Sequence, residues 1–357
     1  MDSEKAVTFL ESSFISEYLL KDKVTDVSFN GTNFYYQTND KGRNKADIRV
    51  ELSMVKDFLR QIANMSEKQF SNMSEKQFSY QNPFLDVSIG RYRINGVHQS
   101  IARKGNEQTL TFSIRIAGEK GLINDDSDFL TEELISLFSV LLDQNISLVI
   151  GGITGSGKTE FQKYLISKMR NNSRVIIIDN ILELSHVSND ERLDFNVWQV
   201  DEKNAEASIQ LLVRNALRSN PDWLIVAESR GAEMLEVLNS AMTGHPIITT
   251  LHALNAQSMP SRMGRMVMMN DKKMDFENVM SDIYYHFRIF IYLKREFQKD
   301  GTVFRYISDI LEFDEQGNSH HIYQFKNGKR TYASLSHEFL SLLKEEQLER
   351  LSEVFKK

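Results

Sequence analysis

The chain has 357 residues, with 43 Lys and Arg against 49 Asp and Glu, so its formal net charge is -6. This acidic balance is not that of a protein that coats nucleic acid non-specifically. Because there is no cysteine, disulfide bridges, a cysteine zinc site, an iron–sulfur cluster and a thiol nucleophile are excluded. The acidic start lacks the pattern of a signal peptide, and the apolar stretches fall short of the roughly 20 residues that span a bilayer. We therefore expect any membrane contact to be peripheral.

The first 120 or so residues have the pattern of a sheet with helices. Two β-rich runs at 24–37 flank an Asn-Gly pair, which predicts a hairpin with a two-residue type I′ turn. Apolar residues recur at helical spacing over 50–62 and predict an amphipathic helix. Residues 84–116 are again β-rich. An α+β domain over residues 1–123 is the expected result.

An exact repeat of eight residues, NMSEKQFS, occupies residues 64–71 and 72–79. Eight residues are too few for a solenoid unit. We interpret the repeat as a duplication that an exposed helix end or loop tolerates.

A polar segment at 124–130 predicts a linker to a second domain over residues 131–357. In that domain short apolar runs alternate with helical stretches, which is typical of a parallel sheet with helices on both faces. The predicted strands lie near 147–150, 175–178, 224–226 and 247–250, with helices from about 158 and over 205–219 and 232–242. The tail predicts strands at 289–293 and 302–307, turns at 299–301 and 327–328, and a Leu-rich helix over about 335–355.

Residues 152–159, GITGSGKT, match the phosphate-binding pattern G-x-x-x-x-G-K-[ST]. The glycines let successive backbone N–H groups point at phosphates, and the loop opens a helix whose N-terminus carries partial positive charge. We expect Lys158 to reach the β- and γ-phosphates of ATP and Thr159 to hold Mg²⁺. The residues expected to bind nucleotide here are Gly152, Thr154, Gly155, Ser156, Gly157, Lys158 and Thr159.

A carboxylate follows the apolar run at 224–226. At the end of a parallel strand, Glu228 could orient the attacking water or hold the Mg²⁺ shell. Many buried strands end in Glu, so a purely structural role is the alternative.

Three further segments carry a family resemblance: LRSNPD at 217–222, AESRGAE at 227–233, and MTGH to TLHA at 242–253. In order and spacing they closely resemble the secretion-ATPase family, the hexameric motors of type II secretion, type IV pili, conjugative type IV secretion and tight-adherence pili. The Arg-Gly-Ala-Glu run at 230–233 is most similar to the conjugative and tight-adherence branch. The resemblance covers about residues 84–313.

The resemblance implies a RecA-like P-loop ATPase domain, with a mostly parallel sheet, preceded by a smaller α+β domain. It also assigns roles to residues outside the phosphate loop. Asp179 and Glu183 fall on the family's acidic box, and Glu228 falls on a second acidic motif, followed by Arg230. His252 occupies the position of a histidine that is thought to sense the γ-phosphate.

In the N-terminal domain, Arg93 and Arg115 match the family's arginines that approach the nucleotide from the other domain. Two of the departures from the family pattern bear directly on the site. Asp179-Asn180 replaces Glu-Asp, which predicts slow hydrolysis if the second position is essential. Glu160 follows Thr159, and its carboxylate would repel phosphate if it pointed inward.

The expected function is that of a cytoplasmic ATPase in an oligomeric ring, expected to be a hexamer, that powers a secretion or pilus machine. Inner-membrane components of that machine are the expected partners, with peripheral contact at the cytoplasmic face of the membrane and no direct nucleic acid. Two alternatives stay open: a DNA-translocating RecA-fold motor, and a nucleotide-binding assembly scaffold with little hydrolysis.

Overall fold

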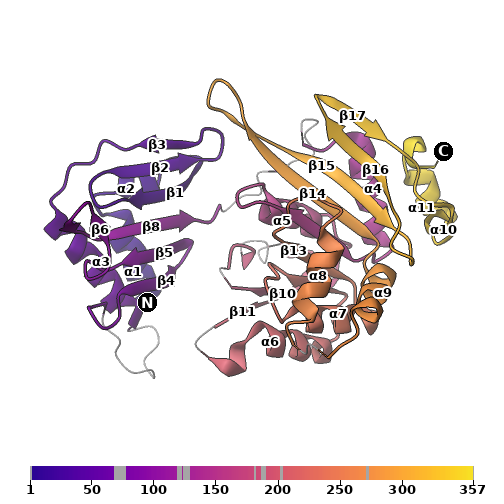
Figure 1. The fold of residues 1–357 in the computed structure, drawn as a ribbon, viewed down its shortest axis with the longest axis horizontal. Helices are drawn as coiled ribbons and strands as arrows, with labels where there is room; N and C mark the ends of the chain where they lie inside the picture. The colour runs from indigo at the N-terminus through magenta and orange to yellow at the C-terminus, as the bar shows by residue number, and fades with distance from the viewer. Residues whose placement is uncertain are drawn as a thin grey trace. The chain divides into compact units, whose positions relative to one another are not determined.

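The computed structural model describes residues 2–67, 78–118, 123, 129–180, 182–185, 190–201, 204–270 and 273–356 (Figure 1). The chain divides into two compact units. The N-terminal unit comprises Met1–Glu119 and Phe297–Phe304, and the C-terminal unit comprises Lys120–Glu296 and Arg305–Lys357. The predicted linker at 124–130 and the tandem repeat at 64–79 fall largely outside the described residues.

The N-terminal unit is built on an antiparallel sheet with the strand order β3-β2-β1-β8-β5-β4. Alternate residues of its central strand β8, such as Phe112 and Ile114, are buried in a core shared with three helices, whereas Ser113 and Arg115 are exposed. The elements are α1 (Asp2–Glu11), α2 (Ser16–Leu19), β1 (Val24–Phe29), β2 (Phe34–Thr38), β3 (Arg43–Lys45), α3 (Leu52–Glu67), β4 (Phe84–Ile89), β5 (Tyr92–Val97) and β8 (Thr111–Ile116), with a separate pair β6 (Arg103–Lys104) and β7 (Glu107–Gln108).

The predicted hairpin is present as β1 and β2, but its turn differs from the prediction. Four residues, 30–33, connect the strands, and the Asn30 side chain organises them. Its Oδ1 accepts hydrogen bonds from the backbone N–H of Thr32 (3.1 Å) and of Asn33 (2.9 Å). An asparagine side chain that bonds the following backbone competes with the tight Asn-Gly turn. The expectation of a two-residue type I′ turn was therefore wrong.

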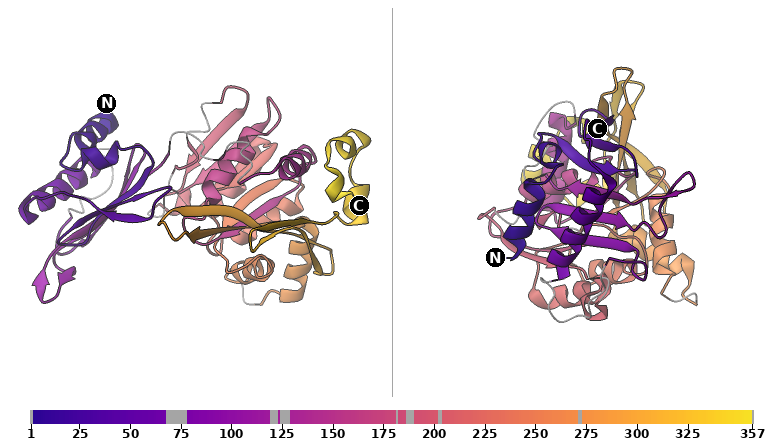
Figure 2. Two further views of the ribbon diagram at one scale, coloured as in Figure 1. Left: turned by 90° about the horizontal axis from the view of Figure 1, so that it is seen from above. Right: turned by 90° about the vertical axis from the view of Figure 1, so that its left-hand side faces the viewer.

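The C-terminal unit contains a nine-stranded sheet with the order β11-β10-β12-β13-β9-β14-β15-β16-β17 (Figures 1 and 2). The six strands from β11 to β14 are parallel, and β15, β16 and β17 pair antiparallel. This confirms the α/β class and the mostly parallel sheet. The strands are β9 (Leu148–Gly152), β10 (Arg174–Asp179), β11 (Asp194–Gln199), β12 (Trp223–Val226), β13 (Ile247–Leu251), β14 (Ile289–Phe297), β15 (Val303–Phe313), β16 (Ser319–Lys326) and β17 (Lys329–Tyr332).

Helices cover both faces of the parallel part. In β9, Leu148 and Ile150 enter a core with α4, α5 and the C-terminal helices, while Val149 enters a second core with α6 to α9. Burial on both faces explains why these strands are continuous apolar runs. The helices are α4 (Glu132–Asp143), α5 (Lys158–Ser167), α6 (Ile209–Ala216), α7 (Met234–Met242), α8 (Met259–Val267), α9 (Phe276–His286), α10 (His337–Ser341) and α11 (Glu345–Arg350).

The predicted C-terminal helix over 335–355 was wrong, because α10, α11 and the short 3₁₀ helix η4 (Glu353–Phe355) replace it. Local hydrogen bonds start each helix anew. The Ser336 hydroxyl accepts from Phe339 N–H (3.0 Å), and Lys344 N–H donates to the Gln347 side chain (2.9 Å). Side chains that bond nearby backbone favour caps over continued helix. Similarly, the helix predicted over 205–219 is interrupted at Ser208, whose backbone is extended.

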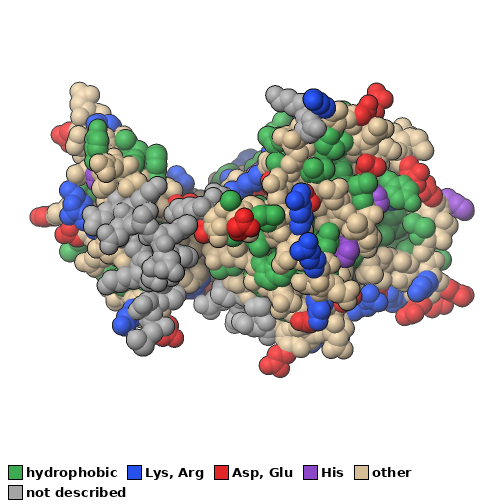
Figure 3. All heavy atoms as spheres, turned by 90° about the horizontal axis from the view of Figure 1, so that it is seen from below, with side chains coloured by type: hydrophobic (Ala, Val, Ile, Leu, Met, Phe, Trp, Pro, Cys, Tyr) green, Lys and Arg blue, Asp and Glu red, His purple; other side chains and the backbone are tan. Residues whose placement is uncertain are grey.

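In the described part of the chain, no helix is long and apolar enough to cross a membrane. On the face shown in Figure 3, Lys and Arg side chains are interspersed with Asp and Glu side chains. That mixture agrees with the balanced composition of the sequence.

Candidate active site

The strand order assembles the candidate site at one edge of the C-terminal sheet. Strands β12, β13 and β9 are consecutive neighbours and run parallel, so the residues that follow their carboxyl ends meet. Glu228 follows β12, His252 follows β13, and the phosphate loop follows β9. In parallel α/β sheets this edge is where ligands bind.

The phosphate loop has the backbone that the motif predicts. Gly152, Gly155 and Gly157 take positive φ values of 155°, 75° and 100°, and Gly157 lies directly before α5. A Cβ on Gly152 would lie 2.4 Å from the Ser156 hydroxyl and 2.7 Å from the Leu293 carbonyl oxygen. Larger residues would therefore not fit here, and glycine is needed at this position.

Lys158 is almost fully buried at the start of α5. Its Nζ donates to the carbonyl oxygens of Gly152 (3.0 Å) and Ile153 (3.2 Å), and it lies 3.4 Å from His252 Nδ1. The ammonium group is thus held over the loop by backbone acceptors.

Glu228, His252 and Arg230 form a contact chain beside this lysine. Glu228 Oε1 lies 2.9 Å from His252 Nε2, and Oε2 accepts a hydrogen bond from Arg230 Nη2 at 2.7 Å. The histidine contact is not aligned with a ring N–H, and the buried Oε1 accepts no hydrogen bond from the residues that the structure describes. This oxygen is therefore buried against the imidazole without an aligned donor in the described part of the chain.

The charges around Glu228 set its ionisation. Burial raises the pKa of Glu228, but the hydrogen bond from Arg230 and the charges of Arg230, His252 and Lys158 outweigh it, so the net shift is downward. The pKa of His252 is lowered by burial and by the charge of Lys158, which together outweigh the opposite effect of Glu228. At neutral pH the site therefore contains an ionised carboxylate beside a neutral imidazole.

The two acidic-box residues lie at the end of the neighbouring strand β10. Asp179 is buried, and its Oδ2 accepts a hydrogen bond from Leu184 N–H at 3.0 Å. Glu183 is half-buried in the turn that this bond closes. Ile178 pairs with Val226, so the carboxyl ends of β10 and β12 lie side by side. At least one carboxylate oxygen of Asp179 is therefore used in a hydrogen bond that stabilises the turn after β10.

Glu160 does not stand alone in the first turn of α5. Its carboxylate lies 2.8 Å from Lys163 Nζ, and this lysine is buried. An ammonium group at this distance offsets the negative charge next to the phosphate loop.

Arg93 and Arg115 lie in the N-terminal unit, on β5 and β8. The strand register places them directly opposite each other. Arg93 forms two hydrogen bonds with Asp86, at 3.3 and 3.2 Å, while Arg115 is exposed. Their assignment to the nucleotide stays a prediction.

Two arginines that the sequence analysis did not single out lie against the phosphate loop. Arg305, on β15, donates from Nε to the Gly155 carbonyl oxygen at 2.9 Å. Arg295, on β14, lies so close that a Cβ on Gly155 would be 2.6 Å from its Nη1. The only sequence signal is indirect: the two residues flank the predicted turn at 299–301, and nothing in the motif links them to a loop about 150 positions earlier.

The residues present fit a nucleotide with Mg²⁺. The positive-φ glycines form a backbone cradle, and the Ser156 hydroxyl inside it is buried and has no hydrogen-bond partner in the described structure. Thr159 offers a hydroxyl oxygen, a ligand type that Mg²⁺ accepts. Within the described ranges no group of three or more His, Asp or Glu side chains could hold a metal alone. A magnesium ion would thus need the nucleotide's oxygens as well.

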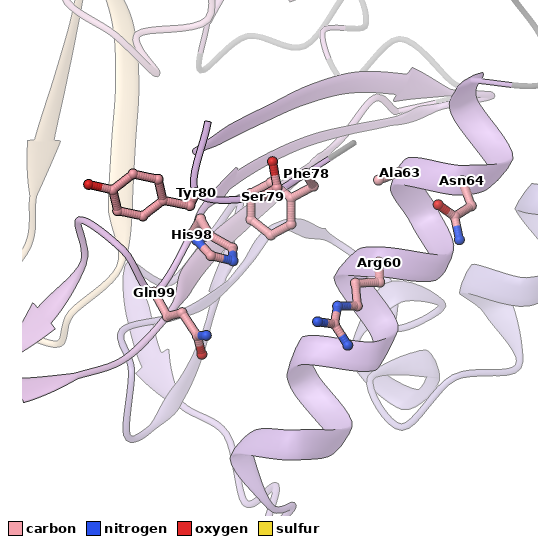
Figure 4. A pocket seen from close by; sticks show the side chains of 8 residues that line it. All are labelled: Arg60, Ala63, Asn64, Phe78, Ser79, Tyr80, His98 and Gln99. Carbon is pink, nitrogen blue, oxygen red and sulfur yellow. The ribbon is translucent and has the colours of Figure 1, made fainter. Parts of the chain in front are cut away.

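A cavity of about 440 Å³ lies apart from these residues, within the N-terminal unit (Figure 4). Arg60 from α3 and the ring of His98 border it, together with Phe78 and Tyr80. Burial, followed by the charges of Lys56 and Arg60, lowers the pKa of His98. The cavity contains none of the predicted site residues.

The chain is similar to known proteins over part or most of its length. Residues 112–284 match the family model described as "Type II/IV secretion system protein". An uncharacterised protein of Bacillus anthracis is 29% identical over 96% of this chain and 78% of its own length. The type IV secretion system protein VirB11 of Brucella suis is 30% identical over 46% of each chain, so the chain matches about half the length of that relative.

A solved structure adds a likeness of fold. The X-ray structure of the Legionella pneumophila ATPase DotB superposes with a TM-score of 0.57 at 18% identity, covering 88% of this chain and 80% of that chain. The family match spans the phosphate loop and the segment that contains Glu228, Arg230 and His252. Over residues 112–284 the chain therefore carries the domain of type II and type IV secretion system proteins.

Proposed function

We propose that this secretion ATPase hydrolyses ATP as an oligomeric motor, a hexameric ring, for a conjugative type IV secretion or pilus-assembly machine. The observation that supports hydrolysis best is the contact chain from Lys158 through His252 to Glu228 and Arg230, beside a complete phosphate loop. The Brucella VirB11 relative supports the type IV assignment. Inner-membrane components would be the partners, with peripheral attachment at the cytoplasmic face.

In this mechanism the loop backbone and Lys158 bind the phosphates. Bound Mg²⁺ would neutralise developing charge on the phosphate oxygens, with Thr159 as its protein ligand. Glu228 would accept a hydrogen bond from the attacking water through its carboxylate and orient the water for in-line attack. Asp179 and Glu183 lie at the next strand end and would assist from there.

His252 would report the state of the site. Its neutral ring contacts both Lys158 and Glu228, so loss of phosphate changes its surroundings from two sides. Arg93 and Arg115 would supply positive charge from the N-terminal unit. Movement of these groups on phosphate release would drive the partner machine.

The test compares Glu228→Gln with the wild type. The amide keeps the size of the side chain but cannot act as a carboxylate acceptor, so phosphate release should fall by about 10²- to 10⁴-fold. The affinity for ADP should change little. Glu315→Gln, at an exposed carboxylate in the turn between β15 and β16, is the matched control and should retain full turnover.

Other outcomes separate the alternatives. Equal inactivity of wild type and Glu228→Gln, with nucleotide binding intact in both, would instead support the assembly scaffold. Hydrolysis that needs DNA would support the DNA-translocating motor. Turnover that rises cooperatively with protein concentration and is accompanied by sixfold mass in light scattering would support the ring.

A further inference from the structure

The β14–β15 hairpin brings a charged donor to the outside of the phosphate loop. Strand β14 pairs with β9 up to the Leu293–Gly152 pair, so it continues past the point where β9 becomes the loop. Strand β15 is its neighbour, joined through residues 298–302. Arg305, half-buried on β15, reaches back and donates from Nε to the Gly155 carbonyl oxygen at 2.9 Å.

The backbone of the phosphate loop changes direction at Gly155. Its φ of +75° turns the chain so that neighbouring N–H groups can converge on an anion. A peptide N–H and the carbonyl of the same peptide group point in opposite directions. A donor that holds the Gly155 carbonyl therefore also fixes the N–H of Ser156, which belongs to the same peptide and donates to the Ile153 carbonyl oxygen at 3.2 Å.

The space around Gly155 and Gly157 also shows that the two arginine side chains lie close to this backbone. A Cβ on Gly157 would lie 3.7 Å from Arg305 Cδ, and a Cβ on Gly155 would lie 2.6 Å from Arg295 Nη1. Both ends of the Gly155–Gly157 segment thus have arginine side chains packed against them. A hydrogen bond from a charged donor is stronger than one between neutral groups.

We propose that Arg305 is a positioning residue for nucleotide binding, which holds the Gly155–Ser156 peptide, and with it the turn of the phosphate loop, in place through its Nε–H. The role is distinct from charge neutralisation, because the donor bonds a loop carbonyl. The expected effect on nucleotide binding rests on the proposed function. The effect of Arg305 on the geometry of the loop can be tested without nucleotide.

Three substitutions separate the hydrogen bond from the charge. In Arg305→Gln the amide nitrogen is bonded to Cδ, as Nε is in arginine, so the donor can be kept while the charge is lost. In Arg305→Lys the charge is kept, but a methylene group occupies the Nε position. Arg305→Met loses both. Arg330→Met, on the edge strand β17 of the same sheet, is the control.

The first readout is calorimetric binding of ADP, followed by KM and kcat for ATP. We expect Arg305→Met and Arg305→Lys to raise the Kd for ADP and the KM for ATP about tenfold, with a smaller change in kcat. Arg305→Gln should stay within about threefold of the wild type, as should the control. Equal weakening of the Gln and Met variants, or rescue by Lys, would show that charge matters and would overturn the proposal.

The second readout is amide hydrogen exchange over residues 152–158 in the protein without nucleotide. The Met and Lys variants should exchange several-fold faster than the wild type and the Gln variant. Unchanged exchange in both would contradict the proposed positioning. Hydrogen exchange is measured without turnover. If the wild type proved inactive, that result would count against the proposed ATP hydrolysis and not against the proposed role of Arg305. If Arg305→Met does not fold, Arg305→Lys against Arg305→Gln provides the same contrast.

Discussion

At the scale of single residues, a few neighbouring groups determine the charge states of Glu228 and His252. At neutral pH Glu228 is held ionised by Arg230 and Lys158 against the effect of burial. His252 is kept neutral mainly by burial and Lys158. The carboxylate can therefore orient water at neutral pH without competition from an imidazolium partner.

Acidification should change this arrangement at His252 first. Because the pKa of His252 in the folded protein is below 6.5, the ring gains its proton only as the pH falls below that value. The imidazolium would then pair fully with Glu228 and withdraw it from water. We expect kcat to be level from about pH 7 to 8 and to fall on the acid side of pH 6.5.

His252→Asn is the test of that assignment, measured as a pH–rate profile. The variant has no titrating ring, so its residual rate should lack the acid limb that we expect for the wild type below pH 6.5. The sign for stability is the same: an unfolded histidine binds its proton at higher pH than the folded one, so folding stability is lost as the pH falls from about 6.5. An acid limb that persists in His252→Asn would assign it to another group.

Asp179 has a structural role in the turn that follows β10. It is buried and accepts the Leu184 N–H. Asp179→Ala would leave this donor without its acceptor, so we expect unfolding free energy to fall by about 1–3 kcal/mol. Asp179→Asn retains an acceptor oxygen and should lose less. Calorimetric melting of both variants checks this, and equal melting temperatures for wild type and Asp179→Ala would contradict it.

At the scale of elements, one buried carboxylate connects the start of the C-terminal tail to the sheet. Glu312, on β15, accepts from Ser336 N–H (2.9 Å) and Ser336 Oγ (2.5 Å), and Arg288 Nη2 lies 3.4 Å away. Arg288 also pairs with Glu338 of α10 at 2.7 Å. These contacts tie the start of α10 to the sheet.

Glu312→Ala should therefore release the tail. It leaves Arg288 without its buried partner and Ser336 without its acceptor, and breaking such a pair costs about 3–5 kcal/mol. We expect faster hydrogen exchange over residues 335–356 and a lower melting temperature. Ser341→Ala, which removes only an exposed hydroxyl in the same helix, should behave as the wild type. Unchanged exchange in Glu312→Ala would show that apolar packing alone holds the tail.

The same tail shows where sequence periodicity fails. Leucines at helical spacing over 335–355 predicted one helix, and the apolar residues Phe339 and Leu351 are indeed buried. The chain nevertheless forms three short elements, because Ser336 and Gln347 bond nearby backbone and restart each helix. The hydrophobic periodicity predicted the buried side chains correctly, but it carries no information on these competing local hydrogen bonds.

At the scale of the whole molecule, the proposed function assigns a role to an arginine of the N-terminal unit. Arg115 is exposed on β8, opposite Arg93. Under the proposed function, Arg115→Gln should lower kcat by about 10-fold or more while leaving the melting temperature unchanged. Phosphate release measured at protein concentrations above and below assembly tests it.

Arg103→Gln is the matched control for that experiment, because Arg103 is also exposed in the N-terminal unit. It should retain full turnover at every concentration. Equal rates for Arg115→Gln and Arg103→Gln would remove Arg115 from the proposed site, without affecting the roles proposed for Glu228 and Lys158.

The sequence by itself determined the phosphate loop, the parallel strands and the residues at their carboxyl ends. Each of these follows from local chemistry: glycines at fixed spacing, apolar runs of strand length, and a carboxylate or histidine directly after a run. The loop motif and the strand end predicted Lys158 and Glu228, and the family resemblance added Arg230 and His252; the structure brings these four residues into contact.

Only the tertiary structure decided which distant residues join them. Arg305 and Arg295 reach the Gly155 backbone because β14 pairs with β9 and β15 follows it, and no spacing along the chain encodes that neighbourhood. The tie between Glu312 and Ser336 arises in the same way. Strand order is set by how the two helical faces pack over the whole sheet, so contacts between strand ends are a property of the folded molecule.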